Sequence, residues 1–210
     1  MELAISFLAV IGAYLIGSLS FAVIVSRAFG LSDPRSYGSK NPGATNVLRS
    51  GNKAAAAVTL LLDALKGWLP VWAANHWAGV AGFGDGTLAL VGLAAFIGHL
   101  FPVFFKFKGG KGVATAAGVL FGVDWLLGLL TLLAWVAVVA VSRYSSLGAL
   151  AAAVFAPVCY LMGSGSGWIS SPQVGVAVVV MSALLVWRHS ENISRLMQGK
   201  ESRLGQKKSG

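Results

Sequence analysis

Two glycine-rich polar segments interrupt a chain that is otherwise mostly uncharged and hydrophobic: YGSKNPGATNVLR at 37–49 and FKGGKGVAT at 107–115. Glycine-rich loops let backbone N–H groups approach an anion closely, and cations beside the glycines add positive charge. The chemistry that both segments favour is the binding of phosphate groups.

The first segment combines two glycines, Gly38 and Gly43, with neutral hydrogen-bond donors and one guanidinium group. Arginine offers a planar fork that suits phosphate oxygens. A short helix beginning near Thr45 would direct its free N–H groups toward the loop. The candidate substrate-binding residues here are Ser39, Thr45, Asn46 and Arg49.

The second segment leads directly into an apolar run that begins at Val113. If that run is a helix, its N-terminus presents free amides and two ammonium groups to an anion. The spacing GxxxxGK[ST] is absent, which disfavours a nucleoside triphosphatase. The alternative is a basic turn at a membrane surface. The substrate-binding candidates are Lys108, Gly109, Gly110, Lys111 and Gly112.

Further polar residues lie in or beside apolar runs. Asp63 and Lys66 are three residues apart, so on a helix they share one face. Two interpretations stay open for them: a structural ion pair, or a cation at Lys66 that binds substrate phosphate. Ser145 and Ser146 begin another apolar run, where either would cap a helix or donate to a ligand oxygen.

His189 closes the last apolar run and is followed three residues later by Asn192. On a continuing helix both side chains would share one face and would hold a hydroxyl substrate. We take His189, Asn192 and Ser145 as catalytic candidates, and Lys66 and Ser146 as further substrate-binding candidates. His76 and His99 are expected to be interfacial and packed polar residues, respectively.

The composition excludes most soluble classes, since 56% of the 210 residues are hydrophobic and 11% charged, with a mean hydropathy of +0.76. The single cysteine, Cys159, allows no intrachain disulfide and no cysteine-based metal site. We expect no metal and no cofactor. The net charge of +9 does not indicate nucleic acid, because the cations flank hydrophobic runs instead of forming one stripe.

The predicted fold is an all-α, polytopic membrane protein. Uncharged or nearly uncharged runs cover about 3–25, 54–75, 87–105, 113–123, 125–141, 147–162 and 174–187. Only Glu2 precedes the first run, so it lacks the basic start of a secretory signal and is expected to be retained. Residues 113–142 form either one long helix or two helices separated near Asp124.

Charge decides between these alternatives. With seven spans and the N-terminus outside, no outer loop carries a cation, and Lys66 lies within a span. A single helix over 113–142 would place seven cations outside, against the positive-inside rule. The 15 inner cations are then Arg27, Arg35, Lys40, Arg49, Lys53, Lys106, Lys108, Lys111, Arg143, Arg188, Arg195, Lys200, Arg203, Lys207 and Lys208.

We therefore predict one domain over 1–210, with seven transmembrane helices, a cytoplasmic C-terminus and a basic, flexible tail at 199–210. Gly118 and Gly122 have the GxxxG spacing that permits close helix packing. Tryptophans are expected as interfacial anchors at span ends. They are Trp77, Trp125, Trp168 and Trp187.

In this topology both glycine-rich segments lie on the inner side, as do SRYSS at 142–146 and RHSENISRL at 188–196. An active site is therefore expected on that face. An anion or phosphate-ester transporter is a second hypothesis, but it would present polar groups through the membrane and on both faces. A non-catalytic scaffold is a third, and it would not need several phosphate-type motifs on one side.

Five ordered segments resemble the bacterial acyl-phosphate-dependent glycerol-3-phosphate acyltransferases, the PlsY family. They are GSKNPGATNVLR at 38–49, DALKG at 63–67, GHLFPVFFKFKGGKGVAT at 98–115, SRYSSLGA at 142–149 and RHSENISRLMQGKESRLG at 188–205. The chain departs from the family at Lys40 and Pro42, where we expect a glycine and a small or β-branched residue. The HxxxxD motif of another glycerolipid acyltransferase class is absent, as are the ordered aspartates of CDP-alcohol phosphotransferases.

The resemblance implies a seven-helix bundle in the bacterial inner membrane with a cytoplasmic active site. It implies acyl transfer from a long-chain acyl phosphate to the 1-hydroxyl of glycerol 3-phosphate, giving lysophosphatidic acid and phosphate. Implied partners are these substrates, membrane lipid and an acyl-phosphate-generating enzyme, without nucleic acid. The family associates the second loop with glycerol 3-phosphate and His189 and Asn192 with activity, and Glu201 resembles its structural glutamate. Either His189 or a substrate phosphate oxygen would accept the proton.

Overall fold

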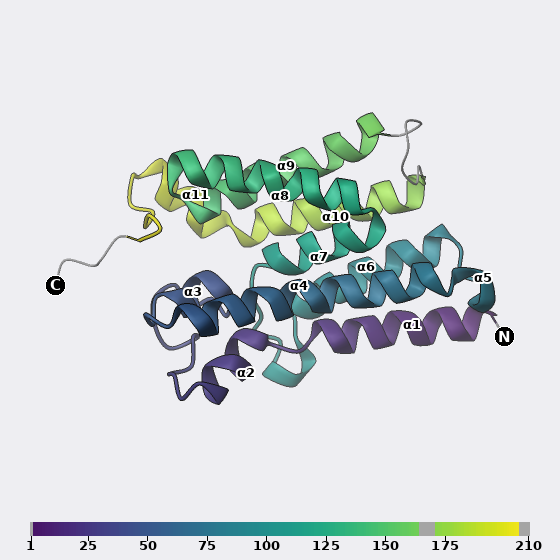
Figure 1. Cartoon of the computed structure of the whole chain (residues 1–210), viewed down its shortest axis with the longest axis horizontal. Coiled ribbons are helices and arrows are strands. Elements are labelled where there is room, and N and C mark those ends of the chain that lie inside the picture. The colour runs from purple at the N-terminus through teal and green to yellow at the C-terminus, as the bar shows by residue number, and fades with distance from the viewer. Residues whose placement is uncertain (1, 164–170, 206–210) are drawn as a thin grey trace.

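The apolar runs of the sequence form long helices that lie roughly along the longest axis of the molecule (Figure 1). The structure, a computed structural model, describes residues 2–163 and 171–205. Within these ranges every regular element is a helix. The elements are α1 (Glu2–Gly17), α2 (Phe21–Ala28), α3 (Ala44–Leu48), α4 (Lys53–His76), α5 (Ala78–Ala81), α6 (Asp85–Leu100), the 3-10 helix η1 (Val103–Phe105), α7 (Val113–Val123), α8 (Trp125–Ser142), α9 (Ser145–Gly163), α10 (Pro172–Arg188) and α11 (Ser190–Met197).

Length and composition give the number of helices able to cross a membrane. Four segments of the described chain qualify: Lys53–His76, Asp85–Phe105, Trp125–Ser142 and Ser145–Gly163. The number rises to six if the bent pairs α1–α2 and α10–α11 each count as one span. Because α7 has only 11 residues, about 17 Å of helix, it is shorter than the hydrocarbon core. The all-helical membrane class is confirmed, and the seventh span remains a prediction.

The predicted break near Asp124 is present. α7 ends at Val123, and the carboxylate of Asp124 accepts hydrogen bonds from the backbone N–H groups of Leu126 (2.8 Å) and Leu127 (3.1 Å). An aspartate in this position satisfies amides that the first turn of a helix leaves free, so α8 begins here. The charge-based division of residues 113–142 into two helices is therefore correct.

Two other expected continuous spans are broken. The run at 3–25 bends by 44° between α1 and α2, and the last run bends by 55° at His189. At the first break the Lys66 ammonium group donates to the carbonyl oxygen of Leu19 at 2.6 Å. Lys66 thus satisfies a backbone group that the interrupted helix leaves exposed. The expectation that the helix continues from His189 to Asn192 is wrong.

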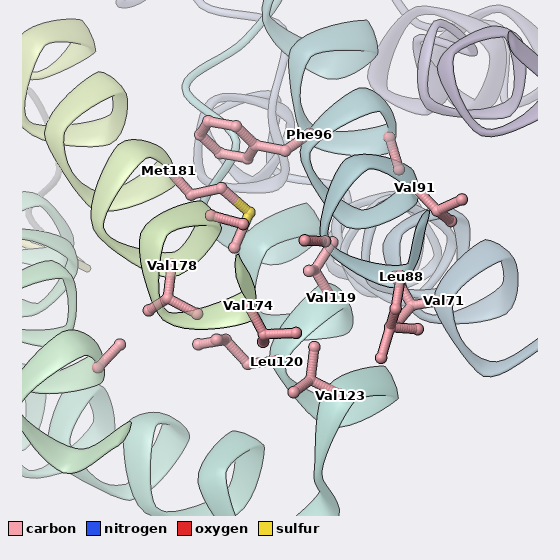
Figure 2. Close-up of a cluster of buried hydrophobic side chains, with 14 of the residues drawn as sticks. Val71, Leu88, Val91, Phe96, Val119, Leu120, Val123, Val174, Val178 and Met181 are labelled. Atoms are coloured by element: carbon pink, nitrogen blue, oxygen red, sulfur yellow. The ribbon is translucent and has the colours of Figure 1, made fainter. Parts of the chain in front are cut away.

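The main core lies where α4, α6, α7 and α10 meet. Figure 2 shows Val71, Phe96, Val119 and Met181 among the side chains that fill this space. Close helix contact supports it: a Cβ on Gly118 of α7 would lie 1.9 Å from the carbonyl oxygen of Ala64 on α4. The predicted small-residue packing is therefore present, and it fixes α7 against α4.

A second, smaller cluster of buried apolar residues joins α2, α3 and α4. Its members are Ala22, Val25, Val47, Ala55 and Ala56. In Figure 1, α2, α3 and α11 lie toward the same end of the bundle as the C-terminus, whereas α5 lies at the opposite end. The apolar cluster thus holds the first glycine-rich loop at one end of the molecule.

Three of the four predicted anchor tryptophans lie at helix ends. Trp77 follows α4, Trp125 begins α8 and Trp187 is the penultimate residue of α10, and all three side chains are exposed. Trp168 lies outside the described residues. The exposed indoles at helix ends are in the positions that suit a membrane interface.

Candidate active site

The first loop is folded around the side chain of Asn46 in α3, which is 2% exposed. Its amide nitrogen donates to the carbonyl oxygens of Pro34 (2.6 Å) and Tyr37 (3.2 Å), and its amide oxygen accepts from the N–H of Ser39 at 3.1 Å. An amide has two donor hydrogens, and both are used here. Asn46 was predicted to bind substrate; these contacts assign it to holding the loop.

Lys40 has a positive φ of 55°, a conformation that glycine adopts more readily than other residues. This geometry explains why a glycine is expected at this position from the family resemblance. Lys40 and Ser39 are both exposed. The loop therefore keeps its turn despite the lysine and leaves these side chains accessible.

The second loop is held between α6 and α10. The guanidinium of Arg188 donates from Nε to the carbonyl oxygen of Gly110 (3.2 Å) and from a terminal nitrogen to that of Gly109 (3.1 Å). The N–H of Gly110 donates to the carbonyl oxygen of His99 at 3.1 Å. A Cβ on Gly110 would lie 2.2 Å from His99 Nε2 and 2.8 Å from the carbonyl oxygen of Pro42. The two glycine-rich loops therefore touch, and only glycine fits at the contact.

The second loop ends at the N-terminus of α7, as predicted. Gly112 precedes the helix with a φ of +85°, and α7 begins at Val113. Within the described part of the chain, the backbone N–H groups of Lys111 and Gly112 have no hydrogen-bond acceptor. Free amides at a helix start are suited to binding an anion.

A chain of polar contacts joins the second loop to the C-terminal segment. The Lys111 ammonium group donates to the side-chain oxygen of Asn192, whose amide nitrogen donates to Glu201 at 2.6 Å. The Glu201 carboxylate also accepts from Ser146 (2.7 Å) and from Arg195 (2.7 Å). Candidates from three distant parts of the sequence thus lie in one network. Glu201 lies at the centre of this network, which agrees with its resemblance to the structural glutamate of the family.

The segment that follows α11 closes over this network. Arg49 donates to the hydroxyl of Ser202 at 2.6 Å, and Leu204 and Arg143 exchange hydrogen bonds through the Leu204 backbone. We call residues 200–204 the C-terminal strap. Residues of the strap bind both the first loop and the start of α9. The flexible tail expected from residue 199 stays a prediction, and residues 206–210 lie outside the described residues.

The serines at the start of α9 have different partners. Ser145 lies 3.3 Å from Thr45, hydroxyl to hydroxyl, which links α9 to the first loop. Ser146 donates to Glu201. Ser146 therefore links α9 to the strap, and its role as a ligand donor stays a prediction.

His189 lies at the bend between α10 and α11 and is 3% exposed. Its Nδ1 is 2.8 Å from the carbonyl oxygen of Leu185, an acceptor, so Nδ1 carries the hydrogen. In neutral imidazole the lone pair is then on Nε2. His189 therefore has the tautomer that a proton acceptor at Nε2 requires, and it lies between Arg188 and Asn192 in sequence.

Lys66 does not join this network. Its ammonium group lies 2.8 Å from the Asp63 carboxylate, and both side chains are buried. His99 approaches the same carboxylate at 3.6 Å and the hydroxyl of Thr115 at 3.1 Å. The contacts of Lys66 match the structural ion pair, one of the two interpretations left open by the sequence.

The charged state of Lys111 is sensitive to pH near neutrality. Burial lowers the pKa of its ammonium group to about 8, and the positive charge of Arg195 acts in the same direction. Lys108, in contrast, is exposed. Burial alone would raise the pKa of Glu201, but hydrogen bonds from Arg195, Ser146 and Asn192 outweigh burial and lower it. Glu201 is therefore an ionised acceptor for the whole network.

An open hollow of about 480 Å³ lies beside the first loop, and Arg49 borders it. The hollow is lined by Gly30, Leu31, Ser32, Ser36, Tyr37, Arg49 and Ser50.

The described residues contain no group of three or more His, Cys, Asp or Glu side chains placed to hold a metal ion.

Sequence reasoning missed two participants, Arg188 and Ser202. Arg188 was interpreted only as a topology signal, although its position next to His189, at the end of an apolar run, was a sign of a site residue. Nothing in the local sequence indicates Ser202, because its partner Arg49 is 153 residues away.

The apolar helices and this cationic, glycine-rich network at one end of them define a multi-pass membrane protein with a candidate anion-binding site. A sequence model of the glycerol-3-phosphate acyltransferase family matches residues 7–199. Similar curated proteins, both named glycerol-3-phosphate acyltransferase, occur in Paraburkholderia phytofirmans (61% identity over 93% of this chain and 89% of the relative) and Bordetella pertussis (59% over 93% and 90%). The chain belongs to the glycerol-3-phosphate acyltransferase family.

Solved structures agree with this assignment. The glycerol 3-phosphate form of PlsY, an integral membrane glycerol 3-phosphate acyltransferase, matches with a TM-score of 0.85 and 40% identity over 95% of this chain and 96% of that one. The lysophosphatidic acid form of PlsY matches with a TM-score of 0.83 and 38% identity over 95% of each chain. The resemblance to the PlsY family and the integral membrane class are therefore confirmed.

Proposed function

We propose that this chain transfers the acyl group of a long-chain acyl phosphate to the 1-hydroxyl of sn-glycerol 3-phosphate, giving lysophosphatidic acid and inorganic phosphate. This reaction is the first committed step of bacterial phospholipid synthesis. The observation that carries the proposal is the junction of Lys111, the free amides at the start of α7 and Asn192 in a single network. The names of the two solved relatives, a glycerol 3-phosphate form and a lysophosphatidic acid form, support the acceptor and the product.

The chemistry needs two anions side by side. Acyl phosphate is a mixed anhydride with a good leaving group, so most of the barrier comes from bringing the reactants together and from their mutual repulsion. Lys111, Arg49 and the loop amides offset that repulsion with fixed positive charge. These groups bind both phosphates, with Ser39, Thr45, Lys108, Gly109, Gly110 and Gly112 completing the two loops.

In the reaction, the 1-oxygen of glycerol 3-phosphate bonds to the acyl carbon as the bond from that carbon to the phosphate oxygen breaks. The hydroxyl proton passes either to His189 Nε2 or to a phosphate oxygen of the substrate. The tautomer of His189 supports the first route, because its Nδ1 is already held by Leu185. Asn192 and Ser145 orient the reactants beside it. Metal and cofactor have no part in this proposal.

We further propose seven spans in the bacterial inner membrane, with the N-terminus outside and the site on the cytoplasmic face. The positive-inside rule supports this orientation, because the cations of the described residues, Lys66 excepted, flank the helix ends that carry the network. The C-terminal strap and α11, which form part of the site, lie at the same end of the bundle (Figure 1). Coupling to an acyl-phosphate-generating enzyme follows from a cytoplasmic site that takes this reactive donor.

The test is an assay of purified protein in detergent with acyl phosphate and glycerol 3-phosphate. Phosphate release is expected to require both substrates, and mass spectrometry should detect lysophosphatidic acid. Parallel reactions with an acyl thioester in place of acyl phosphate identify the donor. Phosphate release in the absence of glycerol 3-phosphate would contradict the proposed reaction. Turnover with the acyl thioester as the only acyl donor would contradict it as well.

The low pKa of Lys111 predicts a pH dependence. Its ammonium group is charged below about pH 8 and loses its charge above it, whereas a phosphate ester with a second pKa of about 6 stays a dianion over pH 7–9.5. We therefore expect kcat/KM for glycerol 3-phosphate to fall as the pH rises through about 8. The Lys111→Arg variant, whose side chain stays charged, should lack this fall. The same profile in both proteins would assign the titration to another group.

A further inference from the structure

Among the cations of the described residues, Arg188 is the one whose hydrogen bonds go to the backbone of the second loop instead of to another side chain of the network. Its guanidinium binds two successive carbonyl oxygens, those of Gly109 and Gly110, at 3.1 Å and 3.2 Å. We propose that Arg188 is a positioning residue that sets the peptide planes of the phosphate-binding loop and does not itself bind phosphate. The proposal rests on the proposed function of the same loop.

The peptide between Gly109 and Gly110 is held from both sides. Its carbonyl oxygen accepts from Arg188, and its N–H donates to the carbonyl oxygen of His99 at 3.1 Å. A trans peptide directs these two groups in opposite directions, and the described chain has no cis peptide. Arg188 on α10 and His99 on α6 therefore clamp one peptide plane between two helices.

The next peptide shows what the clamp achieves. The carbonyl oxygen of Gly110 faces Arg188, so the N–H of Lys111, in the same planar group, points away from Arg188. That N–H has no acceptor within the described residues, and the N–H of Gly112 beyond it is also free. Without the Arg188 contact this peptide is freer to rotate, because Gly110 on its N-terminal side lacks a Cβ that would limit rotation. Arg188 thus aims a free amide away from its own guanidinium group, where the amide stays available to an anion.

The shape of the side chain matters more than its charge in this role. Two N–H groups of one planar guanidinium reach two carbonyl oxygens at once, whereas a lysine ammonium group is a compact point charge on a flexible stem. A phosphate ligand, in contrast, would retain much of its attraction after replacement of arginine by lysine. The variants Arg188→Lys and Arg188→Ala therefore separate positioning from charge.

The experiment measures kinetics and amide hydrogen exchange in Arg188→Lys, Arg188→Ala and the unaltered protein. We expect KM for glycerol 3-phosphate to rise about tenfold or more in both variants, because alanine loses both charge-assisted hydrogen bonds and lysine loses the planar geometry that holds the two carbonyl oxygens together. Exchange of the 106–113 amides, measured without substrates, should speed up in both variants. Arg27→Lys, at an exposed position in the last turn of α2, is the matched control and should behave like the unaltered protein.

Near-normal KM in Arg188→Lys would overturn the proposal, since it would show that charge alone suffices. Unchanged loop exchange in Arg188→Ala would also overturn it. The exchange measurement is independent of catalysis, so failure of the proposed reaction would appear separately, as absent turnover in the unaltered protein. A thermal unfolding curve for each variant identifies any general loss of structure. If Arg188→Lys and Arg188→Ala are equally stable but only Arg188→Lys has a near-normal KM, the result again counts against positioning.

Discussion

Replacing Lys111 by alanine should lower kcat/KM by about 10²- to 10³-fold, the range measured when one preorganised group that stabilises developing charge is removed. Among the described residues of the network, only Lys111 combines three features. Its ammonium group has no carboxylate partner, its backbone N–H has no acceptor, and its side chain contacts the catalytic candidate Asn192. Its loss removes the charge that holds the two anionic reactants close together. Steady-state kinetics with both substrates varied measures the effect.

The fold should survive this change, because Lys111 lies in a loop and alanine leaves no charge unpaired at Asn192. Equal elution volume and similar melting temperature in detergent would show that. Lys53→Ala is the matched control, since Lys53 is an exposed lysine in the first turn of α4, away from the contacts of the network. Comparable losses in the two variants would indicate a general effect of net charge, and normal turnover in Lys111→Ala would remove Lys111 from the site.

The sequence was sufficient for those features of the fold that depend on local chemistry. Asp124 separates two helices because its own carboxylate binds the N–H groups two and three residues later, a signal contained in the sequence around it. The bend between α1 and α2 was not predictable in this way. The run at 3–25 is uncharged throughout, and the group that satisfies the interrupted backbone, Lys66, comes from 47 residues away.

The same distinction holds for the candidate site. The residue types and the side of the molecule were predictable, because loop glycines, cations and helix starts are visible in the sequence. The division of roles was not, since it depends on partners far along the chain. Asn46 was expected to bind substrate, yet its contacts support the first loop. For Lys66 the sequence left substrate binding and a structural ion pair open, and its contacts go to Asp63 and Leu19. Ser146 is joined to Glu201 across 55 residues, a link that no local pattern indicates.

From this long-range link we expect Glu201 to contribute to both stability and activity. Its carboxylate accepts from Ser146 on α9, Asn192 on α11 and Arg195, also on α11, and its side chain is 7% exposed. Removing it leaves three donors without their acceptor. Because Asn192 in turn contacts Lys111, the loss also frees the lysine that we place at the substrate.

Glu201→Gln should therefore lower the free energy of unfolding by about 2–3 kcal/mol, since hydrogen bonds to a charged group contribute about 1.5–3 kcal/mol and a glutamine oxygen can still accept some of them. We also expect kcat to fall at least about tenfold, because Asn192 and Lys111 lose their fixed positions. Thermal unfolding in detergent and steady-state kinetics measure the two effects.

Glu191→Gln provides the matched control, because Glu191 pairs with the same Arg195, at 3.5 Å, but its side chain is 81% exposed. An exposed pair contributes at most about 1 kcal/mol, so this variant should unfold and turn over almost as the unaltered protein does. Equal effects of the two substitutions would mean that the ion pair with Arg195, and not the three-way acceptor at Glu201, stabilises the site. Loss of stability without loss of kcat in Glu201→Gln would separate the strap from catalysis and contradict the connection through Asn192 to Lys111.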